Sequence, residues 1–289
     1  MLTRRDAIKL LGSAAATVAA PYDAFAEPAV YEHLAKRAVA YRRRAVSESH
    51  AVLHVRYGAG PLQTMDIFKP RVPPIRGFAL FFPGGGWRQL GPSYYSHLAA
   101  GLNAHGVAVA VCGYDLCPDV TIRQIINQGR AAVIFLSKRY GGRKVFVFGH
   151  SAGGHLAACM LGTNWQQIDA TMPADLVPSA AGISGLYDLR RLVGDPAYAD
   201  LRLNSMEDAR RVSPIFWNGR RDRTFQTFVG SLESDEFRYN AHSIAKLWKE
   251  DGTQTRATVI PGVNHFSICD LPAQPQTALT GRLVTLAIG

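Results

Sequence analysis

Cysteine is scarce in this chain, which contains only four among its 289 residues. No two of them form a CxxC pair, so the sequence does not indicate a zinc site. We expect no bound metal and no other cofactor. Cys112 and Cys159 lie in apolar stretches, which predicts that they are small residues of the core.

A hydrophobic run long enough to form a stable membrane span is also missing from the N-terminal region. The mild apolar run at 10–20 is short and rich in alanine. It follows the pair Arg4 and Arg5 and precedes the small-residue site Ala24-Phe25-Ala26. This layout predicts a twin-arginine signal peptide over residues 1–26, with an amphipathic first helix as the alternative. We therefore expect a periplasmic or secreted protein without a stable membrane span after processing.

Export also bears on the cysteines. An exported protein can pair its cysteines in an oxidising compartment. A twin-arginine substrate, however, usually folds before export, in the reducing cytoplasm. We therefore expect a fold that does not depend on disulfides.

Acidic residues are in the minority, 22 against 32 lysines and arginines, and the formal net charge is +10. Removal of residues 1–26 leaves the mature chain with a net charge of about +9. The basic residues are scattered, and their densest group, 42–44, has no aromatic series beside it on which bases would stack. We expect no nucleic-acid binding. The excess charge is interpreted as a solvated surface that attracts acidic substrates.

Strand-like and helix-like segments alternate along most of the chain. Two alternating runs, 52–57 and 62–68, surround a turn rich in glycine and indicate a hairpin. The pattern predicts an α/β fold with a mostly parallel central sheet, an antiparallel N-terminal edge and helices on both faces. A chain of this length buries ~75% of its unfolded surface, so we expect one domain over residues 27–289. Segments 27–50 (an Arg-rich helix) and 186–220 (irregular and polar) are the expected cap or pocket segments.

The rest of the chain is organised around Gly149-His-Ser-Ala-Gly153. This pentapeptide follows a predicted buried strand at 144–148 and precedes a helix-like run from His155. Strand, G-x-S-x-G and helix together predict a nucleophile elbow, a sharp turn that lifts the Ser151 hydroxyl above the sheet. Its glycines are expected where neighbouring backbone crowds the turn. The alternative interpretation is an ordinary strand-to-helix turn.

A glycine run after the predicted strand 78–82 is the second chemical feature. Backbone N–H groups of such a run can approach a developing oxyanion, and hydrogen bonds to that charge are a large catalytic contribution. The N–H of Ala152 at the elbow would be a further donor. A flexible loop or anion nest is the alternative for the glycine run.

An acid and a base are expected after the last two strands. His265 follows the predicted strand 256–260 and can act as a general base towards Ser151, although a lone histidine is more often structural. Glu233 follows the strand 225–229 and precedes a helix start at Asp235 and Glu236, where acidic residues are favoured in any case. We therefore assign Glu233 as the residue that orients His265, in the chain order Ser, Glu, His. Trp87, His150 and His155 are expected to shape the substrate pocket.

Five stretches lie in matching order and spacing over residues 50–270: P-G-G-G-W at 83–87, Y-D-L-C-P at 114–118, G-H-S-A-G-G-H-L-A at 149–157, S-G-L-Y-D-L at 184–189 and E-S-D-E-F at 233–237. Together they resemble the arylformamidase (kynurenine formamidase) branch of the esterase-like α/β-hydrolases. In one departure, Pro83 stands where that family's loop usually begins with histidine. The resemblance implies an α/β-hydrolase fold with nucleophile Ser151, acid Glu233, base His265 and oxyanion donors Gly85, Gly86 and Ala152.

We therefore expect a serine hydrolase that cleaves a small-molecule ester or aryl formamide through an acyl-enzyme on Ser151. The alternative within enzymes is an exported carboxylesterase acting on short-acyl or aromatic-acid esters. A ligand-binding hydrolase fold without catalysis is a third hypothesis, which the complete set of Ser151, Glu233 and His265 argues against. The sequence carries no signal for an oligomeric state.

Overall fold

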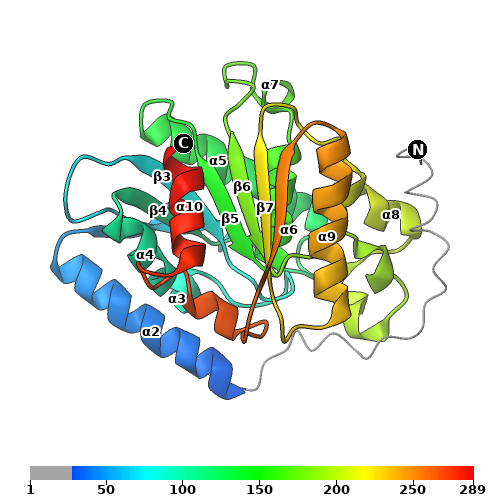
Figure 1. Cartoon of the computed structure of the whole chain (residues 1–289), viewed down its shortest axis with the longest axis horizontal. Helices are drawn as coiled ribbons and strands as arrows, with labels where there is room; N and C mark the ends of the chain where they lie inside the picture. Colours follow the sequence, from blue (N-terminus) through cyan, green and yellow to red (C-terminus); the bar gives the residue numbers. More distant parts are fainter. Residues whose placement is uncertain (1–27) are drawn as a thin grey trace.

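The computed structural model describes residues 28–289 (Figure 1). The predicted signal peptide, 1–26, lies outside the described residues, and export stays a prediction. No helix within residues 28–289 combines the length and the apolar character needed to cross a membrane. All four cysteines are buried and free in this structure, and the independence of the fold from disulfides stays a prediction.

Eight strands form one sheet in the order β1-β2-β4-β3-β5-β6-β7-β8. β1 pairs with β2 and β2 with β4 in antiparallel fashion, while every further pairing, from β4–β3 to β7–β8, is parallel. The predicted mostly parallel sheet with an antiparallel N-terminal edge is confirmed. The strands are β1 (Ala51–Arg56), β2 (Thr64–Phe68), β3 (Gly77–Phe82), β4 (Val107–Cys112), β5 (Phe146–His150), β6 (Ser179–Ile183), β7 (Thr224–Gly230) and β8 (Gln254–Ile260).

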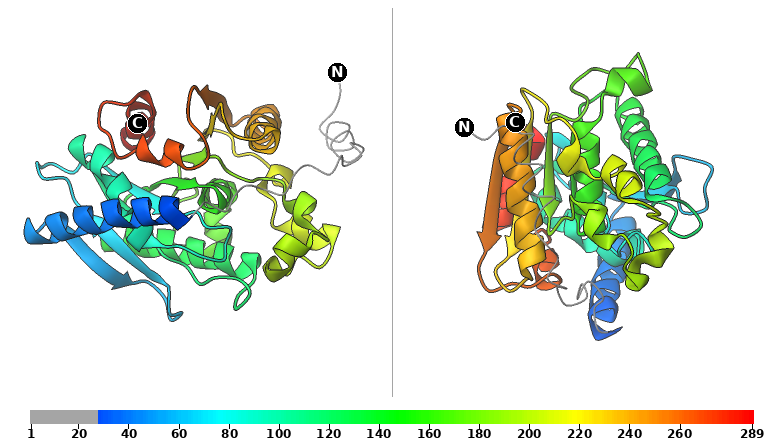
Figure 2. Two further views of the ribbon diagram at one scale, coloured as in Figure 1. Left: turned by 90° about the horizontal axis from the view of Figure 1, so that it is seen from below. Right: turned by 90° about the vertical axis from the view of Figure 1, so that its right-hand side faces the viewer.

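Helices cover both faces of the sheet, as predicted. Apolar residues of α5, α6 and α9 join one buried cluster with one side of the strands, and residues of α2, α4 and α10 join a second cluster on the other side. Figure 2, seen from below, shows α10 and α9 on either side of β8. Every residue of the central strand β4 is buried, as expected for a strand covered on both faces. The helices are α2 (Pro28–Ser47), α3 (Pro92–Tyr95), α4 (Ala99–Ala104), α5 (Ile122–Arg139), α6 (Ala152–Gly162), α7 (Trp165–Ile168), α8 (Met206–Arg211), α9 (Asp235–Glu250) and α10 (Ala278–Ile288).

The apolar spacing of residues 94–105 predicts a single helix there, but the structure breaks this segment into two helices. α3 ends at Tyr95, a 3₁₀ turn follows over Ser96–Leu98, and α4 begins at Ala99. The Ser96 hydroxyl donates to the Pro92 carbonyl at 2.7 Å and also to Asp66. Such side-chain bonds to the preceding turn compete with the regular helix ladder, and they account for the interruption.

The segment 186–220, predicted to be irregular and polar, buries several apolar side chains. It forms 3₁₀ helices at Leu189–Leu192, Pro196–Leu201 and Pro214–Phe216 besides α8. Leu189, Leu201 and Ile215 within it are at most 1% exposed and join the cluster that contains α5 and α6. The segment is therefore part of the core, and its predicted role as a cap stays a prediction.

Candidate active site

Ser151 lies in a strained turn between β5 and α6. Its φ of 54° is positive, a conformation that non-glycine residues adopt at a free-energy cost and that recurs at functional sites. A Cβ on Gly149 would collide with the carbonyl oxygen of Gly153, and one on Gly153 with that of Phe82. Neighbouring backbone therefore crowds the turn as expected, and only glycine fits at positions 149 and 153. The strand, sharp turn and helix of a nucleophile elbow are present as predicted.

Ser151 also caps the N-terminus of α6, whose residues Ala152–Gly162 are all buried. The first N–H groups of a helix have no partner within it, and the helix dipole favours negative charge there. The N–H of Ala152 is the first of these groups. This position suits the donor role predicted for Ala152 towards a developing oxyanion.

The glycine run leaves the sheet beside the elbow, because Phe82 at the end of β3 pairs in register with Gly149 of β5. Gly85 and Gly86 have φ values of 117° and 60°, so both adopt the left-handed conformations that glycine tolerates. The carbonyl of Pro83, the residue that departs from the family pattern, accepts a hydrogen bond from the Tyr114 hydroxyl at 2.8 Å. Pro83 is thus held in place, and the donor roles of Gly85 and Gly86 stay predictions.

The buried side chains of Glu233 and His265 are hydrogen-bonded, with 2.8 Å between Glu233 Oε2 and His265 Nδ1. The side chain of Glu233 is 0% exposed. Its other oxygen, Oε1, accepts from the Ser184 hydroxyl and from the Gly230 N–H, both at 2.6 Å. An ionised carboxylate only accepts hydrogen bonds, so Nδ1 carries the proton and Nε2 is left to accept one. This is the orientation that a histidine base requires.

His265 is tied to the elbow through the residue that precedes the nucleophile. His150 Nε2 donates to the backbone carbonyl of His265 at 2.8 Å. The imidazole of His265 packs on Phe237, with ring centroids 4.3 Å apart, and on His150 at 4.6 Å. β6 and β7 separate β5 from β8 in the sheet, so this link brings the base back to the nucleophile strand.

Three residues that support the site had no role in the sequence analysis: Ser184, Phe237 and Tyr95. Ser184 follows β6 directly, with a φ of 51°, and therefore lies at the same sheet edge as Ser151. That position, within S-G-L-Y-D-L, is the signal that would have found it. Tyr95 Oη lies 3.4 Å from His150 Nδ1, a contact between distant segments that no local pattern indicates.

The acidic helix start behaves as expected. Asp235 is the first residue of α9, its side chain is 98% exposed, and it pairs with Arg238. Glu236 pairs with Arg191. Neither contacts His265, so the choice of Glu233 among the three carboxylates agrees with the geometry.

The three predicted pocket residues are all buried close to the elbow. Trp87 is 1% exposed and meets the ring of His155 edge-on, at 5.2 Å between centroids. His155 Nε2 donates to the carbonyl of Val212 at 2.6 Å, which connects α6 to the segment 186–220. In this structure the three residues support the elbow from within the protein. Contact of Trp87, His150 and His155 with a substrate stays a prediction.

Burial of these histidines predicts a loss of stability in acid. Burial lowers the pKa of His155 to about 4, and burial together with the nearby His265 lowers that of His150 well below its usual range. Both stay neutral in the folded protein while the unfolded chain binds protons below pH ~6.5, so stability should fall from there towards pH ~4. The free energy of unfolding should change by about 1.4 kcal/mol per pH unit for each histidine in this range. Urea unfolding at several pH values measures it.

A matched pair of variants isolates the contribution of His155 to the pH dependence of stability. His155→Gln should make the dependence of unfolding free energy on pH shallower, whatever it does to stability at neutral pH. The same change at the exposed His242 should leave the slope as it is. Identical slopes for the two variants would contradict the assignment of a neutral, buried His155.

Comparisons with known proteins show the family to which the chain belongs. The profile of an alpha/beta hydrolase fold family matches residues 79–268. Kynurenine formamidase of Danio rerio is 26% identical over 250 residues, 84% of each chain, and that of Drosophila melanogaster is 27% identical over 258 residues, again 84% of each. A solved structure from Silicibacter sp., described as a candidate thioesterase, has 28% identity and a TM-score of 0.80, covering 93% of this chain and 98% of its own.

A more distant solved structure shows the shared fold alone. An esterase of Pyrobaculum calidifontis has 20% identity and a TM-score of 0.66, covering 92% of this chain and 94% of its own. The family profile spans more than half of the 289 residues. The chain therefore belongs to the alpha/beta hydrolase family and is a hydrolase.

Proposed function

We propose that the protein cleaves an aryl formamide or a short-acyl ester through an acyl-enzyme on Ser151. The observation that carries this proposal is the 2.8 Å bond from His265 to Glu233, with the backbone of His265 bonded to the residue before Ser151. A base oriented by a buried carboxylate, and linked to the residue that precedes a strained serine, fits the arrangement that serine hydrolases of unrelated folds share.

The chemistry follows from these positions. Ser151 Oγ attacks the carbonyl carbon of the substrate while Nε2 of His265 takes its proton. The oxyanion that forms is stabilised by the N–H groups of Gly85, Gly86 and Ala152. His265 then gives the proton to the leaving amine or alcohol, and the acyl group stays on Ser151. Water activated by His265 releases the acid and restores the serine.

A small acyl group is proposed because the space behind the glycine loop is filled. Trp87 follows the glycines, is 1% exposed and packs on His155. A long acyl chain directed there would have to displace packed side chains, at a cost of ~1–3 kcal/mol. The relatives described as kynurenine formamidases support formyl as the acyl group and an aromatic amine as the leaving group.

A hydrolysis panel tests the acyl group directly. Among p-nitrophenyl esters from formate to octanoate, kcat/KM should be highest for the shortest acyl groups and fall by roughly one to two orders of magnitude for the longest. Trp87→Ala should shift the optimum to longer chains. A preference of the unmodified enzyme for octanoate would refute the small acyl site.

The second candidate is a carboxylesterase for short-acyl or aromatic-acid esters. The similarity to a solved structure described as a candidate thioesterase, at 28% identity over most of both chains, favours an activated ester over an amide. N-formylaniline compared with phenyl formate, which carry the same acyl group, separates the two. Cleavage of the ester alone would assign the protein to the carboxylesterases.

A further inference from the structure

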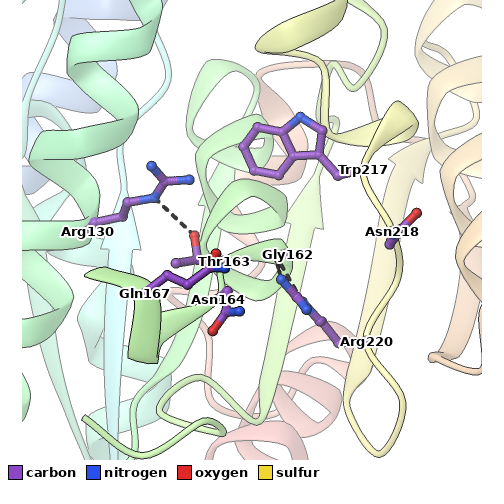
Figure 3. Close-up of a pocket in the computed structure, with 8 residues that line it drawn as sticks. All are labelled: Arg130, Gly162, Thr163, Asn164, Gln167, Trp217, Asn218 and Arg220. Atoms are coloured by element: carbon purple, nitrogen blue, oxygen red, sulfur yellow. Dashed lines mark hydrogen bonds between the residues drawn. The ribbon is translucent and has the colours of Figure 1, made fainter. Parts of the chain in front are cut away.

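A polar cavity of about 300 Å³ lies at the far end of the nucleophile helix. It surrounds the C-terminus of α6, whereas Ser151 precedes the first residue of that helix. Eleven helical residues span about 16 Å, and neither Ser151, Glu233 nor His265 lines the cavity. It is therefore separate from the candidate active site. Its lining residues are Arg130, Gly162, Thr163, Asn164, Gln167, Trp217, Asn218 and Arg220 (Figure 3).

Two arginines of this cavity are held by neutral groups. Arg130 donates to the Thr163 hydroxyl at 3.1 Å and to the Asn127 side chain at 2.9 Å. Arg220 donates twice to the Gly162 carbonyl, at 3.1 and 2.8 Å. In the part of the chain that the structure describes, no ion pair with a carboxylate includes either arginine. Both guanidinium groups lie at the C-terminal end of α6, whose dipole contributes about half a negative charge, so two full positive charges leave the cavity with a net positive charge.

The surroundings of Arg130 increase the attraction for an anion. The side chain is half-buried. Burial lowers its pKa, and the positive charge of Arg123 acts in the same direction. An anion bound here would relieve both effects, because a partly buried charge gains more from a partner than an exposed one.

The other residues that line the cavity indicate what kind of molecule carries the anionic group. Trp217 presents the only large apolar surface of the cavity, with its ring centroid 6.0 Å from the Arg130 guanidinium carbon. Figure 3 shows Arg130 and Arg220 on either side of Thr163 and Asn164, with Trp217 above them in this view. Asn164 and Gln167 add amide groups that both donate and accept hydrogen bonds. The hydroxyls of a sugar ring can bond to both amides, whereas the ring of an aromatic acid offers them no hydrogen-bonding group.

We propose that this cavity binds a monosaccharide that carries a carboxylate. The carboxylate lies between Arg130 and Arg220, the C–H face of the sugar ring stacks on Trp217, and the sugar hydroxyls bond to Asn164 and Gln167. The volume is at the lower end of the range for small-molecule sites, which fits one sugar ring. The site goes beyond the proposed hydrolysis and is independent of it.

Tryptophan fluorescence reports directly on this site. Trp87, Trp165 and Trp248 are at most 1% exposed, whereas Trp217 is half-buried and lines the cavity. D-glucuronate is the probe. Three control ligands accompany it: D-glucose has the sugar ring without a charge, and acetate has the carboxylate without a ring. Glucose 6-phosphate carries a phosphate in place of the carboxylate. Glucuronate should give a saturable change with a Kd on the order of 1 mM. The other three should bind at least about tenfold more weakly.

Variants locate the binding. Arg220→Gln should weaken glucuronate binding about tenfold or more, since a hydrogen-bonded charge pair is lost. Arg220 also holds the end of α6, so Gln167→Ala, at an exposed side chain, provides a second test that should weaken binding without affecting folding. Arg221→Gln makes the same charge change at the neighbouring exposed position, outside the cavity lining, and should leave the affinity as it is. Hydrolysis of p-nitrophenyl acetate by Gln167→Ala should be unchanged.

Several results would overturn the proposal. If acetate or glucose 6-phosphate bound as tightly as glucuronate, the positive charge alone would account for binding. If glucose bound as tightly as glucuronate, the arginines would not contribute to binding. Equal loss of affinity in the Arg220 and Arg221 variants would place the ligand elsewhere. No saturation by glucuronate, measured by fluorescence and by calorimetry, would exclude the site altogether.

Discussion

Ser151→Ala and His265→Ala should each lower kcat by roughly 10⁴- to 10⁶-fold, as expected when a nucleophile or its base is removed from a catalytic unit. In the proposed mechanism Ser151 supplies the atom that forms the acyl-enzyme, and His265, which is hydrogen-bonded to the buried Glu233 carboxylate, is the base. Steady-state hydrolysis of p-nitrophenyl acetate measures the loss. Labelling by a fluorophosphonate probe should disappear in the Ser151 variant.

The double variant is the decisive control. Because the two residues act in one step, Ser151→Ala combined with His265→Ala should be little worse than either single change. Far-UV circular dichroism and the Tm of all three variants should show an intact fold. Losses that multiply would mean that the residues act independently, and the shared mechanism would be wrong.

Glu233→Gln should lower kcat by roughly 10³- to 10⁴-fold. The carboxylate accepts three hydrogen bonds, from His265, Ser184 and the Gly230 backbone, and its side chain is fully buried. A glutamine keeps the shape but has only one accepting atom, so at least one donor loses its partner and the tautomer of His265 is no longer fixed. The effect should be on kcat more than on KM, because the fully buried Glu233 side chain acts through His265.

Asp235→Asn is the matched control for this change. Asp235 lies two residues further along the chain, but its side chain is 98% exposed and pairs with Arg238. An exposed pair of this kind contributes ~0–1 kcal/mol, and activity should stay within about twofold of the unmodified enzyme. If Asp235→Asn proves the more damaging of the two, the acid has been assigned to the wrong residue.

The positions of the strands and their mostly parallel pairing were predictable because the parallel strands are buried on both faces. Val107–Cys112 and Phe146–His150 consist almost entirely of apolar and small residues, a composition that polar surroundings would not favour. The ends of elements were less predictable. The nucleophile strand begins at Phe146, two residues after the start that its composition suggests.

Failures of prediction occurred where distant residues compete with a local pattern. The helix expected at 94–105 is interrupted by hydrogen bonds of Ser96, one of them to Asp66 on β2. The segment 186–220 has the composition of an irregular surface region, yet it buries Leu189, Leu201 and Ile215. Asp66 in the first place, and the strands and helices that pack on the segment in the second, lie elsewhere in the chain, and local composition holds no information about them.

The sequence by itself was enough to predict a nucleophile, its acid and its base, and the structure brings the predicted acid Glu233 and base His265 together. Each follows a strand in a parallel sheet, and the ends of parallel strands meet at one edge, so order along the chain translates into position. Only the tertiary structure decided how these residues are held: Ser184 and Gly230 on Glu233, and His150 on the backbone of His265. The same is true of the cavity around Arg130 and Arg220. These contacts join residues up to 115 positions apart, and their geometry depends on the twist and packing of the whole sheet rather than on any local pattern.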